Sequence, residues 1–113
     1  MKQSKLEQRV HALAALVDYQ TGSIVSRTML NKSMGNVTLF AFDADESLSE
    51  HTSPHDALAI SIEGTIEISI GNDVHQLATG DILPMPAQVP HALRAIERCK
   101  LLLILMHDAQ TNV

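Results

Sequence analysis

Short apolar segments separated by turn residues fill this chain from Gly22 onward. Segments rich in Val, Ile, Leu and Thr are typical of β-strands when Gly, Asn, Asp or Pro punctuate them at regular spacing. The segments expected to be strands are residues 23–30, 36–42, 57–62, 65–70, 74–79, 82–86, 92–96 and 99–107. This pattern predicts an all-β sandwich or barrel.

Two stretches of this region have special features. Residues 43–49 are acidic and polar, so we expect a loop there. Residues 82–86 contain Pro84 and Pro86. Because proline cannot donate a backbone hydrogen bond, this strand should lie at a sheet edge or at a bend.

Residues 1–22 form a segment that we expect to precede the barrel. Apolar residues recur at helical spacing between Leu6 and Val17, and Ser4 with Glu7 fits a capping box. The pattern predicts a short helix over residues 5–17, ahead of a barrel over residues 23–107. A chain of 113 residues can form one domain around one core, and we expect a single domain over residues 1–113.

The composition narrows the classes of partner. The formal net charge is −5, no basic cluster occurs, and the aromatic residues are two Phe and one Tyr with no Trp. Nucleic-acid surfaces need basic patches or stacking rings, so we expect no nucleic acid as a partner. The longest apolar run is too short to cross a bilayer, and the N-terminus does not resemble a signal peptide, so we expect no membrane association. Because Cys99 is the one cysteine, no internal disulfide can form, and we expect a cytoplasmic protein.

Two motifs in the middle of the chain resemble the paired motifs of the cupin family. In that family the first motif holds two His, a Glu and a closing Gly, and the second holds a Gly, a Pro, another Gly and a final His. The positions that match are His51, Gly64, Gly80, Pro86 and His91. Ser53, Ala57 and Gln88 replace the second His, the Glu and the Gly after the Pro. The resemblance implies a double-stranded β-helix, or jelly-roll barrel, with His51 and His91 inside its mouth.

The resemblance also raises the question of a metal ion. Two neutral imidazoles at His51 and His91 could bind one divalent transition metal such as Zn, Ni, Mn or Fe. A stable catalytic site normally has three protein ligands, and Ser53 and Ala57 do not supply the missing ones. His55 is the nearby candidate for a third ligand. Alternatively, the histidines are structural and fix their loops by hydrogen bonds.

Two functions from different classes remain open, because the fold alone does not show whether the protein is an enzyme. The first is a module that binds a small molecule in the barrel without a full metal triad. Its expected pocket residues are His51, Ser53, His55, Met85 and His91. Nearby aliphatic residues predict a small, mainly apolar ligand with one polar group. The alternative is a metal-dependent enzyme of the oxygenase or isomerase class that uses His51, His91 and His55.

Glu63 and Gly64 suggest a two-residue turn between paired strands. The side chains that this hairpin would direct to the interior are Ala57, Ala59, Ser61, Ile66, Ile68 and Ile70. The outer face then carries Leu58, Ile60 and Ile62, and an exposed apolar stripe usually marks an interface. Similar cupins are commonly dimers, so we expect a homodimer that buries these three residues. The alternative is that the N-terminal segment of the same chain covers them.

Overall fold

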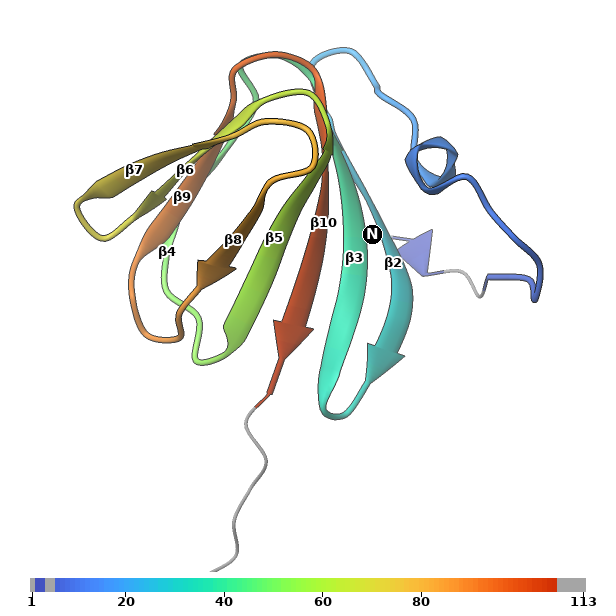
Figure 1. Ribbon diagram of the computed structural model, residues 1–113, viewed down its shortest axis with the longest axis horizontal. Coiled ribbons are helices and arrows are strands. Elements are labelled where there is room, and N and C mark those ends of the chain that lie inside the picture. Colours follow the sequence, from blue (N-terminus) through green and yellow to red (C-terminus); the bar gives the residue numbers. More distant parts are fainter. Residues whose placement is uncertain (1, 4–5, 108–113) are drawn as a thin grey trace, which may run out of the picture.

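Two β-sheets packed face to face make up the protein in a computed structural model, which describes residues 2–3 and 6–107 (Figure 1). One sheet has six strands in the order β1-β2-β3-β10-β5-β8, and the other has four in the order β4-β9-β6-β7. The elements are β1 (Lys2–Gln3), the 3-10 helix η1 (Leu13–Leu16), β2 (Ile24–Lys32), β3 (Gly35–Phe42), β4 (Ser47–His51), β5 (Asp56–Glu63), β6 (Ile66–Ile70), β7 (Asp73–Leu77), β8 (Ile82–Met85), β9 (His91–Ala95) and β10 (Cys99–Met106). Apart from β1 and β2, the pairs within these ranges are antiparallel, which confirms the predicted jelly roll.

All eight predicted strands are present, but β4 lies where a loop was expected. It pairs with β9 at an edge of the smaller sheet. Four of its five side chains are exposed, and only Leu48 is partly buried. A strand without a buried apolar face leaves no alternating hydrophobic pattern, so the sequence signal for β4 is missing.

Strand β8 lies at the edge of the six-stranded sheet, as its prolines predict. It pairs with β5 on one side, where Pro84 lies opposite Leu58. No strand of the described residues pairs with the other side of β8, so a proline without an N–H group costs no ladder hydrogen bond on that side.

The predicted N-terminal helix is wrong: among residues 2–3 and 6–107, only η1 is helical, as a single 3-10 turn. The Ser4 capping residue lies outside the described residues. Val10 on the expected apolar face is 93% exposed, whereas Val17 is buried against Leu39 and Ala41 on the outer face of the larger sheet. Packing against the sheet therefore outweighs a helical periodicity that is too short to be stable alone. No helix in residues 2–3 and 6–107 is long and apolar enough to span a membrane.

We call residues 11–20 the N-terminal strap. The Nζ atom of Lys100 donates a hydrogen bond to the carbonyl of Ala14, and the Tyr19 hydroxyl donates one to Glu63 at 2.5 Å. Burial, followed by the bond to Glu63, raises the pKa of Tyr19, so this hydroxyl keeps its proton. These two bonds fasten the strap to β5 and β10. The alternating pattern of those strands gave no sign of these contacts.

The predicted hairpin at Gly64 is also wrong, because β5 and β6 belong to different sheets. Gly64 has φ +79° and carries the chain from one sheet to the other. The predicted interior face is nevertheless correct at Ala59, Ser61, Ile66 and Ile68, all fully buried. Alternation determines which side chains point inward, and it does so whether the two strands pair or face each other across the core.

Gly64→Ala should destabilise the fold more than Gly22→Ala. Both glycines have positive φ, but a Cβ at Gly64 would stand 2.3 Å from the carbonyl oxygen of Arg98, whereas a Cβ at Gly22 meets nothing within 4 Å. The backbone strain alone costs about 1–2 kcal/mol, and the added overlap brings Gly64→Ala to about 2–5 kcal/mol. Urea unfolding of both variants measures this difference, and equal losses would contradict it.

Two apolar clusters hold the fold together, one on each face of the larger sheet. The inner core between the sheets contains Phe42, Ala59, Ile66, Ile68, Leu77, Met85, Leu93, Ala95, Cys99 and Leu101. The outer cluster, under the strap, contains Val17, Leu39 and Ala41, with Leu16, Tyr19, Val25, Met29, Ile62 and Leu102 packed against them. The strap therefore covers one part of the outer face and leaves the part over β5 and β8 open.

Candidate functional site

His51 and His91 meet at the end of the smaller sheet. His51 is the last residue of β4, His91 is the first of β9, and the two are cross-strand partners. Their ring centroids are 4.2 Å apart with an interplanar angle of 73°. An irregularity in the pairing between Leu48 and His51 accompanies this approach. The antiparallel pairing of β4 with β9 thus brings together two histidines that lie far apart in sequence.

Backbone carbonyl groups orient both rings. The Nδ1 atom of His51 lies 2.9 Å from the carbonyl oxygen of Ser49, and Nδ1 of His91 lies 3.3 Å from that of Val89. A carbonyl oxygen only accepts, so Nδ1 of each neutral ring carries the proton and donates it, which leaves the Nε2 lone pair available. Ring orientation by a second hydrogen bond is also what metal-binding histidines show.

The two histidines differ in exposure. His91 is 8% exposed, whereas His51 is exposed to solvent. Burial lowers the pKa of His91, and the neighbouring charge of His51 lowers it further. His91 is therefore a neutral imidazole around neutral pH, with a lone pair for a hydrogen-bond donor or a cation.

His55 has a different partner. Its ring stacks on that of His107, with centroids 3.8 Å apart and an interplanar angle of 17°. The pairing of Met106 with Asp56 at the end of β10 places His107 beside His55. Within residues 2–3 and 6–107, no three His, Cys, Asp or Glu side chains are grouped to hold a metal ion.

The remaining pocket residues predicted from the sequence have structural contacts. The Ser53 hydroxyl accepts a hydrogen bond from the backbone N–H of His55 at 3.2 Å, and the Ser53 carbonyl accepts one from Gln88 at 2.8 Å. Met85 is 3% exposed and belongs to the inner core. These contacts tie the loop after β4 to the loop after β8.

A cavity of about 310 Å³ lies on the inner face of the larger sheet. Its lining residues are Thr28, Asn31, Asn36, Thr38, Phe40, Leu103 and Leu105. The Thr28 and Thr38 hydroxyls are 3.2 Å apart and hydrogen-bonded. Figure 1 shows that the turn between β2 and β3, the start of β5 and β9, and the end of β10 share one open end of the sandwich. The cavity and the histidine pair lie toward this end, on opposing sheets.

None of these cavity residues was predicted from the sequence. Thr28 and Thr38 are cross-strand partners on the inner face, as are Asn31 and Asn36. The sequence signal for them is a change along the inward face of the strand. Apolar side chains such as Phe40 give way to polar ones at Thr38 and Asn36. Polar side chains at intended core positions point to a functional region.

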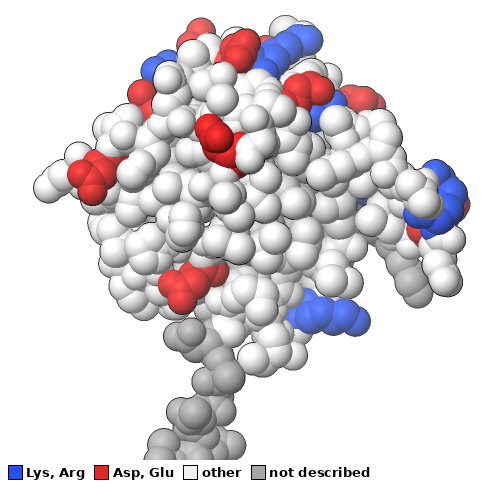
Figure 2. All heavy atoms as spheres, viewed as in Figure 1, with Lys and Arg blue, Asp and Glu red and all other residues white. Residues whose placement is uncertain are grey.

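Lys and Arg form no basic patch on the face shown in Figure 2. Lys and Arg stand apart from one another, mostly beside Asp or Glu, near the edges of the view. Arg94 pairs with Glu67, and Arg98 pairs with Asp43. The absence of a nucleic-acid partner stays a prediction.

The comparisons identify the family. The family model described as a cupin domain matches residues 38–105. The chain belongs to the cupin family. It is similar to a conserved protein of unknown function from Streptococcus pyogenes, with 30% identity over 93% of this chain and 92% of that one and a TM-score of 0.88. A cupin superfamily protein from Desulfitobacterium hafniense has 27% identity, coverage of 91% and 94%, and a TM-score of 0.86.

A third solved structure shows how part of a longer chain can share this barrel. The cupin 2 conserved barrel domain protein from Leptotrichia buccalis is 34% identical over 82% of this cupin and 45% of its own chain, with a TM-score of 0.79. A comparison with curated proteins found no match. The relatives therefore establish the fold and the family of this cupin, and its activity has to be argued from its site.

The residues of this cupin fit a metal ion only in part. The nitrogen donors of His51 and His91 are suitable for a divalent transition metal. The other motif positions, Ser53 and Ala57, offer a hydroxyl already hydrogen-bonded to the backbone and a methyl group. Two imidazoles form an incomplete set where a catalytic site usually has three protein ligands.

Cys99 does not belong to this site. It is fully buried in the inner core, and burial, followed by the charge of Glu97, raises its thiol pKa to about 12. A thiol with such a pKa is neither a ready nucleophile nor a ready metal ligand at neutral pH.

Proposed function

We propose that this cupin binds a small molecule at the open end of its barrel, without a full metal triad. The observation that carries this proposal is the cavity of about 310 Å³ with hydroxyl and amide groups at one wall. Its volume is at the lower end of ligand pockets, which are mostly apolar with a few placed polar groups. Across the same end of the sandwich, the His51 and His91 rings have Nε2 lone pairs to offer.

The chemistry of the walls suggests the class of ligand. Phe40, Leu103 and Leu105 offer apolar surface. The Thr38 hydroxyl donates a hydrogen bond to Asn36 Oδ1 at 3.2 Å, so the side-chain NH₂ of Asn36 is the donor that this wall would offer to a ligand. An imidazole with its Nδ1 proton directed to a carbonyl accepts a hydrogen bond at Nε2. A small, partly apolar molecule with at least one hydroxyl or N–H group fits these requirements.

Binding should be detectable with a panel of soluble fragments that includes phenol and benzyl alcohol. We expect saturation-transfer NMR signals for some members, with shifts of Leu103 and Leu105 methyl resonances. Phe40→Ala should weaken binding about tenfold or more, since it removes a large apolar wall. Val74→Ala is the matched control, because Val74 is an exposed residue of the other sheet. Equal binding to both variants, or no binding by any fragment, would argue against this site.

A metal-dependent enzyme is the alternative, and the orientation of both histidine rings favours it. Each ring directs Nδ1 to a carbonyl oxygen, which leaves two Nε2 atoms free for one cation. When bound, a transition metal would supply a Lewis acid at the barrel mouth. His51 and His91 would hold it, and His55 would have to leave its stack on His107 to complete a triad.

We also propose that a second copy of the chain covers the open part of the outer face. Leu58, Ile82 and Met106 are 38%, 55% and 53% exposed there, and Ile60 and Ile104 are partly buried beside them. A shallow groove of about 370 Å³ runs over this area of β5, β8 and β10. Ile62, by contrast, packs under the strap, so the interface expected from the sequence is reduced to Leu58 and Ile60. We call the five exposed or partly buried residues the open apolar patch.

A further inference from the structure

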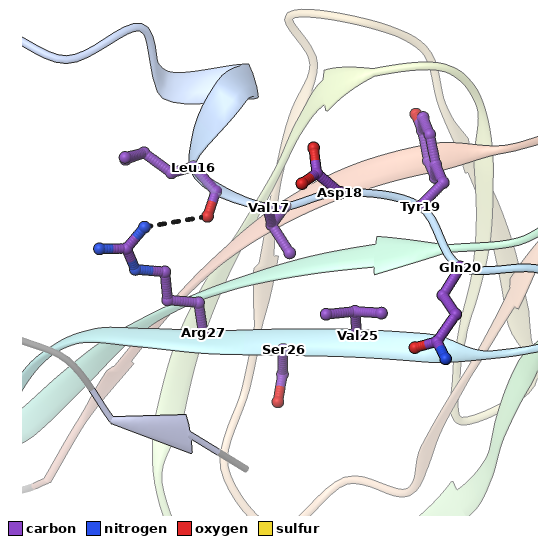
Figure 3. A pocket seen from close by; sticks show the side chains of 8 residues that line it. All are labelled: Leu16, Val17, Asp18, Tyr19, Gln20, Val25, Ser26 and Arg27. Atoms are coloured by element: carbon purple, nitrogen blue, oxygen red, sulfur yellow. Dashed lines mark hydrogen bonds between the residues drawn. The ribbon is translucent and has the colours of Figure 1, made fainter.

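A second cavity lies on the opposite face of the larger sheet from the barrel interior. It has a volume of about 670 Å³, is open to solvent, and is lined by residues 16–20 of the strap and residues 25–27 of β2 (Figure 3). Arg27 and Leu16 form one end of it, Tyr19 and Gln20 lie at the other, and Val17 and Val25 lie between them. The sheet itself separates this cavity from the barrel mouth.

Arg27 is the unusual residue of this cavity. Its Nη1 atom donates a hydrogen bond to the carbonyl of Leu16 at 3.1 Å. Its Nε atom is buried and has no hydrogen-bond partner. Among the described residues, every other buried side-chain nitrogen or oxygen has a hydrogen-bond partner. Arg9, Arg94 and Arg98 each form an ion pair, whereas no described carboxylate lies within ion-pair distance of Arg27.

Such an arrangement calls for an acceptor. Leaving a buried donor such as the Arg27 Nε–H group without a partner is unfavourable. The guanidinium of an arginine presents its donors in a flat fork that matches the two oxygens of a carboxylate. A carboxylate fits this fork, because its two oxygens can accept from Nε and a neighbouring Nη together.

We propose that this strap cavity is a second binding site, which takes a small molecule with one carboxylate and an apolar chain. The carboxylate binds Arg27, and the chain lies along Leu16, Val17 and Val25 toward Tyr19. Asp18 also borders the cavity, but its side chain is exposed, so water and salt screen its repulsion of a bound anion. Because Nε is covered, the strap must shift outward between its fastenings at Ala14 and Tyr19 as the ligand enters.

Hexanoate is a suitable probe, and hexanol is its uncharged counterpart of similar length. We expect hexanoate, titrated to millimolar concentrations, to shift the Arg27 Nε–Hε resonance saturably, together with the amides of residues 16–20. Hexanol should leave the Arg27 resonance in place. Arg27→Met keeps the apolar stem and should weaken hexanoate binding about tenfold or more, since charge-assisted hydrogen bonds are lost.

Two controls separate this site from others. Arg94→Met removes an exposed arginine of the smaller sheet and should bind hexanoate like the wild type. His91→Ala changes the barrel mouth and should also leave the titration unchanged. If Arg27→Met does not fold, Arg27→Lys, which keeps the charge but loses the fork, provides the comparison. An unshifted Arg27 resonance, an equal shift by hexanol, or binding unaffected by the Arg27 substitution would overturn the proposal.

Discussion

The double change His51→Ala with His91→Ala should abolish any uptake of Zn²⁺ or Ni²⁺ by this cupin at neutral pH. The two rings are 4.2 Å apart and hold Nδ1 toward carbonyl oxygens, so their Nε2 atoms are the nitrogen donors that a shared cation would use. Each single change should leave one imidazole, which binds too weakly to retain metal through dialysis. Metal analysis of dialysed protein without a histidine tag measures the uptake.

Two further variants sharpen this test. His11→Ala is the control, since His11 lies in the strap and contacts the Glu7 carbonyl instead. His55→Ala decides the third ligand: uptake unchanged means that His55 stays on His107, and weakened uptake means that it joins the pair. Metal retained by the double variant would exclude the pair as the binding site.

The pH dependence of the same uptake has a defined sign. A protonated imidazole has no lone pair for a metal, so uptake should fall as the solution becomes more acidic. Because burial holds the pKa of His91 below the ordinary value of about 6.5, this loss should occur at lower pH than for an exposed histidine. The same shift means that the unfolded chain binds a proton more readily, so acid also weakens the folded state there.

Ile60→Glu should convert a dimer into a monomer. Ile60 lies on the outer face of β5 between Leu58 and the strap, and its neighbours across the sheet are Ile82 and Leu102. Fully burying one aliphatic side chain contributes roughly 1.5–3 kcal/mol, and a glutamate buried there without a partner opposes association further. Sedimentation velocity or light scattering at micromolar concentration measures the change.

The control and a second variant guard against simple unfolding. Val74→Glu alters a residue that is 65% exposed on β7, in the other sheet, and should leave the mass unchanged. Ile82→Glu places the charge at a more exposed position of the open apolar patch than Ile60, so it should disrupt the dimer with little effect on the monomer's fold. A wild-type protein that is monomeric under these conditions would rule out the dimer proposal.

Short-range patterns determined much of this protein. Alternation along the strands correctly identified the inward side chains at Ala59, Ser61, Ile66 and Ile68. The two prolines correctly placed β8 at a sheet edge. The spacing of His51 and His91 within two motifs anticipated the cupin fold, which the family match to residues 38–105 confirms. These features depend on the geometry of one strand or one turn, so neighbouring residues are enough to specify them.

Only the tertiary structure decided which strands are partners and which surfaces are covered. Gly64 was predicted to form a hairpin turn, yet it joins two sheets. Alternation along a strand shows which side chains point inward, but it does not show whether the next strand is its neighbour in the same sheet or faces it across the core. A helix was predicted over residues 5–17, yet residues 11–20 form a strap, because Val17 gains more from packing on Leu39 and Ala41 than a short helix gains alone. The hydrogen bond from Arg27 to Leu16, and the cavity beside it, exist only because that strap lies over β2. Each of these outcomes depends on contacts between residues distant in the chain, whose pairing no local pattern records.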